Sequence, residues 1–248
     1  MSPEHGSLWR PGLTPEGRSD LGHDQVEVPA DQHLLARIRE VREELDEAGP
    51  DRVRRPGDFT YVALPRADAD VLRDILVAEK AQVVIEVGLA YGVSALAVAE
   101  AVVVAEDADA NHLIIDAFQD HFHDSGWNAL VRAGLGSVCT LLRERSQIAL
   151  PRLLTEGFSA DAAFVDGSHI FHNVFVDLAL LRNLVRPGGL IILDDCDLPS
   201  VATAVRYFEL NTGWQPEPVP SETRIRAYRL PDPLVEPSFE DFKPFGLG

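Results

Sequence analysis

One short segment organises this sequence: Val83-Val84-Ile85-Glu86-Val87-Gly88-Leu89-Ala90-Tyr91-Gly92-Val93-Ser94. An apolar run ends at an acidic residue, and two glycines then flank a turn that leads into Ala-rich sequence. Continuous apolar runs are typical of strands buried in a parallel sheet, and glycines at a strand end let the backbone approach a ligand closely. The acid disfavours a phosphate-binding turn, which presents bare amides and a positive helix end. The segment therefore predicts a strand and a turn that bind a ligand carrying hydroxyls and a positive charge.

Composition narrows the class of protein. The 248 residues carry a net charge of −18, from 40 acidic against 22 basic residues, and no basic cluster appears that would attract a polyanion. We therefore expect no nucleic-acid partner. The two cysteines do not form a disulfide framework, the first thirty residues lack the apolar core of a signal peptide, and no apolar run approaches the ~20 residues that span a bilayer. These observations predict a cytoplasmic protein without a membrane partner.

The chain divides into three parts. Residues 1–66 form an N-terminal arm and helical extension, in which residues 1–30 lack periodicity and a helix capped by Asp31 runs to Ala48. Residues 67–232 form the main domain, and residues 233–248 form a Pro-containing tail. We expect the extension helix, together with residues 59–61, to cover the mouth of the main domain and shape its acceptor pocket.

Strands and helices alternate along the main domain. The predicted strands are 83–88, 112–116, 138–142, 161–166, 190–194 and 224–230. The predicted helices are 67–81, 93–105, 128–133, 148–156, 171–185 and 199–210, with a turn at 186–189. Such alternation implies right-handed crossovers and a doubly wound, mainly parallel α/β sheet with helices on both faces.

Four of the predicted strands end in a carboxylate: Glu86, Asp116, Asp166 and Asp194. Ligands in doubly wound sheets bind outside the carboxyl ends of the strands. We expect the carboxylate of Asp116 to accept hydrogen bonds from both hydroxyls of a ribose. We expect the ring of Phe118 to stack near an adenine. The alternatives are that Asp116 caps a loop and that Phe118 is a core residue.

Three segments together resemble a known family: Glu86–Ser94, Asp166-Gly167-Ser168-His169, and Arg186–Asp195. They are similar to class I S-adenosylmethionine (SAM)-dependent methyltransferases, in particular the small-molecule group called methyltransferase domain 24 and the related catechol-type and macrolide-sugar O-methyltransferases. The resemblance covers about Val71 to Leu210. It implies a seven-stranded Rossmann-like fold and SAM as cofactor, with these cofactor-binding residues: Glu86, Gly88, Tyr91, Gly92, Ser94, Asp116, Phe118, Ser146 and Asp166.

The resemblance to metal-dependent relatives implies a metal site at Asp166, Asp194 and Asp195. Ends of neighbouring parallel strands lie ~4.8 Å apart, so three carboxylates there can converge on Mg²⁺ or another divalent cation. Asp195 stands where catechol-type enzymes have Asn. The alternative is a metal-free site in which Asp194 or Asp195 caps a loop.

His169 lies three residues after Asp166, and we assign these two residues to catalysis. A neutral imidazole at this place is able to take the proton of an acceptor hydroxyl. The alternative is a histidine at a helix start that bonds to backbone.

The leading interpretation is O-methylation of a hydroxyl on a small metabolite or natural product, a sugar or a phenol. Metal-independent N-methylation of a small molecule and a non-catalytic SAM-binding protein are the alternatives. An NAD-binding protein is disfavoured because the spacing Gly88-x-x-x-Gly92 is not G-x-G-x-x-G. The sequence leaves open the acceptor, the methylated atom and whether the chain forms a homo-oligomer.

Overall fold

The computed structural model describes residues 30–105 and 110–246. The predicted arm, residues 1–30, lies outside the described residues apart from Ala30. The side chain of Asp31, the predicted helix cap, also lies outside them.

Seven strands form one sheet in the order β3-β2-β1-β4-β5-β7-β6. They are β1 (Val83–Val87), β2 (Asn111–Ile115), β3 (Cys139–Leu142), β4 (Ala160–Val165), β5 (Val185–Leu193), β6 (Gln215–Glu217) and β7 (Arg226–Arg229). The first five strands are parallel, whereas β7 pairs antiparallel with β5, and β6 pairs antiparallel with β7. This arrangement confirms the predicted doubly wound, mainly parallel sheet.

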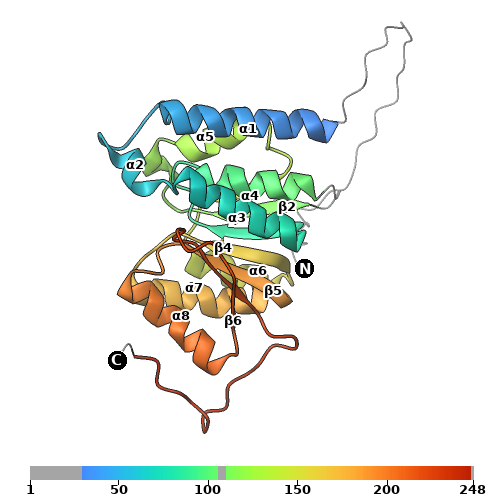
Figure 1. Cartoon of the computed structure of the whole chain (residues 1–248), viewed down its shortest axis with the longest axis vertical. Helices are drawn as coiled ribbons and strands as arrows, with labels where there is room; N and C mark the ends of the chain where they lie inside the picture. The colour runs from blue at the N-terminus through green and yellow to red at the C-terminus, as the bar shows by residue number, and fades with distance from the viewer. Residues whose placement is uncertain (1–29, 106–109, 247–248) are drawn as a thin grey trace, which may run out of the picture.

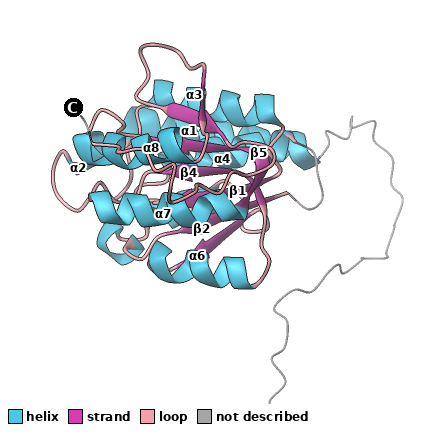
Figure 2. Cartoon of the chain, turned by 90° about the horizontal axis from the view of Figure 1, so that it is seen from below, coloured by secondary structure: helices cyan, strands magenta, loops and turns pink. Residues whose placement is uncertain are grey.

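Helices cover both faces of the sheet (Figures 1 and 2). One face carries α3 (Arg66–Glu79), α4 (Val93–Val104) and α5 (Ser125–Arg132), and the other carries α6 (Ser146–Thr155), α7 (Phe171–Leu184) and α8 (Pro199–Asn211). The alternation of strand and helix therefore places the sheet between two helical layers and leaves the carboxyl ends of its strands uncovered by them.

The extension helix α1 (Ala30–Ala48) packs on the outer side of α4 (Figure 1). The prediction that it covers the carboxyl ends of the strands is therefore wrong. Its apolar stripe, Ile38, Val41 and Leu45, is buried in one cluster with Leu96 and neighbouring residues of α4. The physical reason is that residues 94–103 of α4 are buried on every side of the helix and all but Ser94 and Glu100 are apolar, so α4 needs a cover on each side.

Several short elements were not predicted from the sequence. A one-turn helix, α2 (Asp58–Val62), lies in the segment expected to be loop, and a 3₁₀ turn, η1 (Gln119–Phe122), precedes α5. Strand β5 includes residues 186–189, which were predicted as a turn. Its pairing with β4 shifts register between Ala160 and Ala162, and Gly188 has φ +71°. Strand β5 therefore contains a local bulge and pairs with β4 both before and after it.

Backbone hydrogen bonds align the acidic strand ends. The amide of Gly88 donates to Ile115, that of Asp116 to Leu142, and that of Asp166 to Val87, at 2.9–3.0 Å. The amide of Asp194 donates to Val165 at 3.2 Å. The residues that directly follow β1, β2, β4 and β5 therefore meet at one edge of the sheet.

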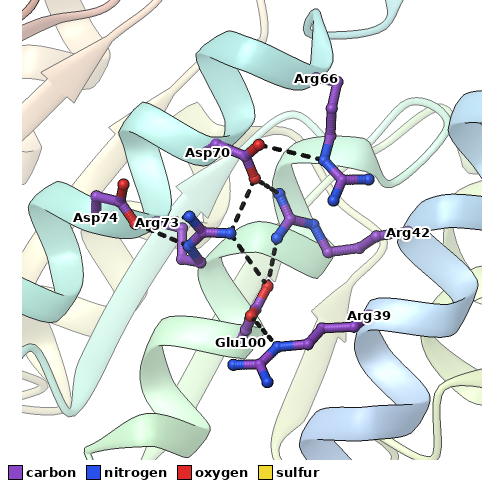
Figure 3. Close-up of polar contacts among 7 residues, drawn as sticks. All are labelled: Arg39, Arg42, Arg66, Asp70, Arg73, Asp74 and Glu100. Carbon is purple, nitrogen blue, oxygen red and sulfur yellow. Dashed lines mark hydrogen bonds and ion pairs between the residues drawn. The ribbon is translucent and has the colours of Figure 1, made fainter.

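A network of ion pairs joins α1, α3 and α4 (Figure 3). Glu100 is the single charged residue of α4 and is 2% exposed. Its carboxylate accepts hydrogen bonds from Arg39, at 2.7 Å, and from the buried Arg42. Arg42 also donates to Asp70 at 2.6 Å, and Arg73 donates to Asp70 at 2.9 Å. Packing of α1 on α4 removes the charges of Arg42 and Glu100 from water, and these ion pairs compensate for that loss of hydration.

We expect Glu100→Gln to lower the free energy of unfolding by about 3 kcal/mol, because it removes the one buried negative charge that Arg39, Arg42 and Arg73 share and leaves the buried Arg42 with Asp70 as its remaining carboxylate partner. Urea denaturation measures this loss. The matched control is Glu40→Gln, which removes an exposed pair with Arg37 and should cost less than about 1 kcal/mol. Equal losses in the two variants would contradict this account of the network.

Candidate functional site

A cavity of about 610 Å³ opens at the carboxyl ends of the parallel strands. Its walls come from the turn at 88–94, the end of β2 at 115–118, the start of α6 at 144–147, the loop at 166–170 and the segment at 61–64 before α3. The size is within the range of pockets that hold nucleoside-sized ligands. The predicted ligand-binding edge is thus hollow and faces the acidic strand ends.

The glycine turn depends on close backbone contacts. Gly88 has φ +102°, and a Cβ on it would lie 2.3 Å from the carbonyl oxygen of Asp166. Gly92 has φ +84°, and a Cβ there would lie 3.0 Å from the backbone of Gly126. Side chains at either position would push the turn away from β4 and α5. The two predicted glycines therefore set the shape of the cavity wall.

Asp116 holds the same turn from the side of β2. Its Oδ2 accepts hydrogen bonds from the amides of Leu89 and Ala90 at 3.0 and 3.1 Å, and its Oδ1 accepts the amide of Phe118 at 2.7 Å. The side chain of Gln119 donates to Oδ2 at 3.1 Å. Asp116 therefore does cap the loop that follows β2, which was the alternative to a ribose contact. Asp116 also lines the cavity, so a ribose contact remains a prediction for this carboxylate.

Glu86 requires a correction. Its carboxylate is fully buried within β1, and the lining of the cavity, within the described part of the chain, does not include it. Ser94 donates to Oε1 at 2.5 Å, and Nε2 of His112 lies 2.7 Å from Oε2, without the alignment of a hydrogen bond. Side chains alternate between the faces of a strand, and this one points into the helical layer. Glu86 supports Ser94, which does line the cavity.

Three further predicted cofactor residues lie at the cavity. Tyr91 is buried, and its hydroxyl donates to Asp58 of α2 at 2.5 Å. The ring of Phe118 is 45% exposed, which contradicts the core-packing alternative, and the guanidinium carbon of Arg145 lies 5.6 Å from the ring centre. Ser146 is buried at the first turn of α6 and faces the cavity.

Asp166, His169 and Asp195 form a tight group on the cavity wall. One ligand atom from each lies within 4.8 Å of the others. The Nε2 of His169 lies 2.8 Å from Oδ2 of Asp195 and 3.9 Å from Oδ1 of Asp166. The two carboxylates raise the pKa of His169 to about 10. This raised pKa favours the protonated imidazole over the neutral base that the sequence predicts, so the role of His169 as a base stays a prediction.

Asp194 does not join this group, although it was predicted as a metal ligand. Its side chain is 1% exposed and accepts a hydrogen bond from Nη2 of Arg224 at 2.6 Å. Nη1 of Arg224 lies 3.6 Å from Asp195, so this arginine spans the two adjacent acids. The left-handed conformation of Asp195, φ +55°, explains why the two side chains diverge. His169, and not Asp194, is therefore the third possible metal ligand beside Asp166 and Asp195.

Sequence reasoning missed Arg224, Asp177 and Asp58. Arg224 lies just before an antiparallel strand, and the sequence gives no sign that this segment returns to the parallel strand ends. Asp177 lies within α7 and faces the cavity beside Ser146. The sequence did contain a signal for Asp177: apolar residues surround it on the predicted helix, which indicates that its carboxylate is buried with them.

A comparison with protein families now identifies the domain. Residues 85–196 match a family model described as a methyltransferase domain. Residues 85–196 of the chain form a methyltransferase domain. The matched range begins inside β1 and ends directly after the Asp194–Asp195 pair, so it contains the glycine turn, the Asp166–His169 loop and both acids.

Solved structures share the fold of this methyltransferase domain. The O-methyltransferase TomG from Streptomyces achromogenes, involved in tomaymycin synthesis and solved with SAM, is 19% identical over 80% of this chain and 89% of its own, with a TM-score of 0.57. An O-methyltransferase from Bacillus cereus in complex with SAH is 18% identical over 82% and 93%, with a TM-score of 0.54. A putative O-methyltransferase from Klebsiella pneumoniae is 18% identical over 80% and 90%, with a TM-score of 0.60.

No curated protein matches the chain. Among the described residues, no helix combines the length and the apolar character that crossing a membrane requires.

We expect Gly88→Ala to lower the free energy of unfolding by about 2 kcal/mol or more and to weaken binding of S-adenosylhomocysteine at least tenfold, because a Cβ would collide with Asp166 and strain the backbone. Calorimetry measures both effects. Gly136→Ala is the control, since a Cβ there meets nothing within 4 Å. A Gly88→Ala protein with unchanged affinity would show that the turn is not part of the nucleoside site.

Burial raises the pKa of Asp177 to about 6, against the opposing effect of a hydrogen bond with Ser146. The folded state therefore penalises the ionised carboxylate, and stability present near pH 4 is lost as pH rises through about 6. We expect Asp177→Asn to raise the free energy of unfolding by up to about 3 kcal/mol at pH 7.5, with the gain vanishing toward pH 4. Urea titrations at several pH values check this. The exposed Asp241→Asn should show no such trend, and a gain independent of pH would refute the assignment.

Proposed function

We propose that this enzyme transfers the methyl group of SAM to a hydroxyl of a small metabolite or natural product, a phenol or a sugar, with assistance from a divalent cation. The observation that carries the proposal is the group formed by Asp166, His169 and Asp195 on the wall of the cavity that the glycine turn also lines. The solved structures reported as O-methyltransferases support it. TomG, which takes part in tomaymycin synthesis, supports a natural-product acceptor.

The donor atoms of this group fit a divalent cation. Two carboxylates and an imidazole suit Mn²⁺ and related ions, and carboxylate oxygens suit Mg²⁺. Asp166, His169 and Asp195 would hold the ion, and the ion would supply Lewis-acid polarisation of the acceptor hydroxyl. Binding through His169 requires its neutral form, so a bound cation and the protonated imidazole exclude one another.

The chain's own residues mainly position the two reactants. Methyl transfer from a sulfonium is an in-line displacement, in which orientation and exclusion of water supply most of the rate. The glycine turn and Asp116 form the nucleoside side of the cavity, and Tyr61 and Ile170 lie on its rim with exposed apolar surface. We assign these two side chains to the acceptor, whose apolar body they would cover.

A metal-independent N-methyltransferase is the second candidate, and one observation favours it. His169 and Arg224 already place two positive charges against Asp166, Asp194 and Asp195. These contacts compensate most of the negative charge without an added ion. A SAM-binding protein without turnover is the remaining alternative.

We also propose a small-molecule acceptor in a cytoplasmic setting, without a nucleic-acid or membrane partner. The net charge of −18 disfavours phosphate-rich partners, and both cysteines are free, which suits a reducing compartment.

The test is methyl transfer from SAM to a panel of phenols, catechols, sugars and amines, with products identified by mass spectrometry. We expect an O-methylated product whose rate falls at least tenfold with EDTA and returns with Mg²⁺ or Mn²⁺. Asp195→Ala, which removes the ligand oxygens altogether, should lower kcat at least a hundredfold and leave the affinity for S-adenosylhomocysteine within about threefold. An amine product formed equally well in EDTA would establish the N-methyltransferase instead. Tight binding of S-adenosylhomocysteine without turnover of any acceptor would favour the non-catalytic protein.

A further inference from the structure

A second cavity, of about 270 Å³, lies between α1, α2, α4 and the start of α3. It is distinct from the site at the strand ends, although Ala63, Leu64 and Val93 separate the two cavities and line both. Most of its lining is apolar: Leu45, Phe59, Ala63, Leu64, Pro65, Val93 and Leu96. The cavity therefore suits a ligand with a compact apolar body.

Two arginines give this apolar cavity a positive wall. Arg42 and Arg66 both line it, and both bind the carboxylate of Asp70, at 2.6 and 3.3 Å, so that their guanidinium groups lie close together (Figure 3). Arg42 is 4% exposed, and its Nε has no hydrogen-bond partner among the described residues. A buried charged donor without a partner is unfavourable, and an anionic acceptor next to it removes that penalty.

The surrounding charges leave the arginines incompletely compensated. The network in Figure 3 contains four guanidinium groups, of Arg39, Arg42, Arg66 and Arg73, against three carboxylates, of Asp70, Asp74 and Glu100. One further acid, Asp46, lines the cavity, but Asp46, Arg39 and Asp74 are exposed, so solvent screens their charges. The buried and half-buried members are three guanidinium groups, of Arg42, Arg66 and Arg73, and two carboxylates, of Asp70 and Glu100. The local balance is therefore positive in a chain whose net charge is −18.

We propose that this second cavity binds a small carboxylic acid with an aliphatic or aromatic body, its carboxylate at Arg42 and Arg66 and its body among Leu45, Phe59 and Leu96. A carboxylate matches the fork geometry of a guanidinium, whereas the apolar lining rejects a free inorganic anion, which would lose its hydration without apolar contact.

The experiment uses the full chain saturated with S-adenosylhomocysteine, so that the main cavity is filled. Benzoate and hexanoate are titrated by ligand-observed NMR, with benzamide and hexanamide as neutral probes of the same shape. We expect the carboxylates to bind at least tenfold more tightly than the amides. Equal binding of acids and amides, or no binding of either acid, would overturn the proposal.

Variants locate the binding. Arg66→Met should weaken carboxylate binding at least fivefold, and Arg66→Lys should weaken it less, because the charge remains although the fork of donors is lost. Thr60→Trp should abolish binding by filling the cavity from an exposed position, while the affinity for S-adenosylhomocysteine stays unchanged. Arg206→Met, which removes an exposed arginine of α8, is the charge control and should change nothing. Carboxylate binding that persists in Thr60→Trp, or that falls equally in Arg206→Met, would place the ligand elsewhere and refute this site.

Discussion

Asp116 joins the ends of β1 and β2, which form one wall of the cavity. Its carboxylate accepts amide hydrogens from the turn after β1 and from the loop after β2, so one side chain satisfies backbone donors of two segments. Amides in such a tight turn cannot pair with one another, and buried amides without a partner are costly. The position of Gly88 against the backbone of Asp166, and hence the distance between β1 and β4 at the cavity, depends on this turn being held in place.

The parts of the fold that repeat along the chain were predictable from the sequence. Apolar runs predicted the five parallel strands, and the acids that follow them predicted the edge where the site lies, because strand direction fixes which ends meet. The place of α1 was not predictable in the same way. Its stripe indicates that it packs on something apolar, but the choice between the mouth of the sheet and the outer face of α4 depends on the all-round burial of α4.

The site was predicted at the level of segments better than at the level of side chains. Asp166 and Asp195 meet on the cavity wall as expected, whereas Glu86 and Asp194 point into the protein. Whether a strand-end carboxylate faces the ligand or the interior depends on one backbone angle or one position in the strand, as the left-handed Asp195 shows. Partners from distant segments, such as His112 and Arg224, decide the outcome, and local sequence does not contain them.

The reversed direction of β7 has a consequence for how the protein is made. Arg224, which neutralises Asp194, is about thirty residues further along the chain than β5 and reaches the cavity because β7 runs antiparallel beside β5. A ribosome releases the acidic ends of β4 and β5 before this arginine emerges, and a domain generally folds as a unit. The ion pair between Asp194 and Arg224 therefore forms only after the last strands have left the ribosome.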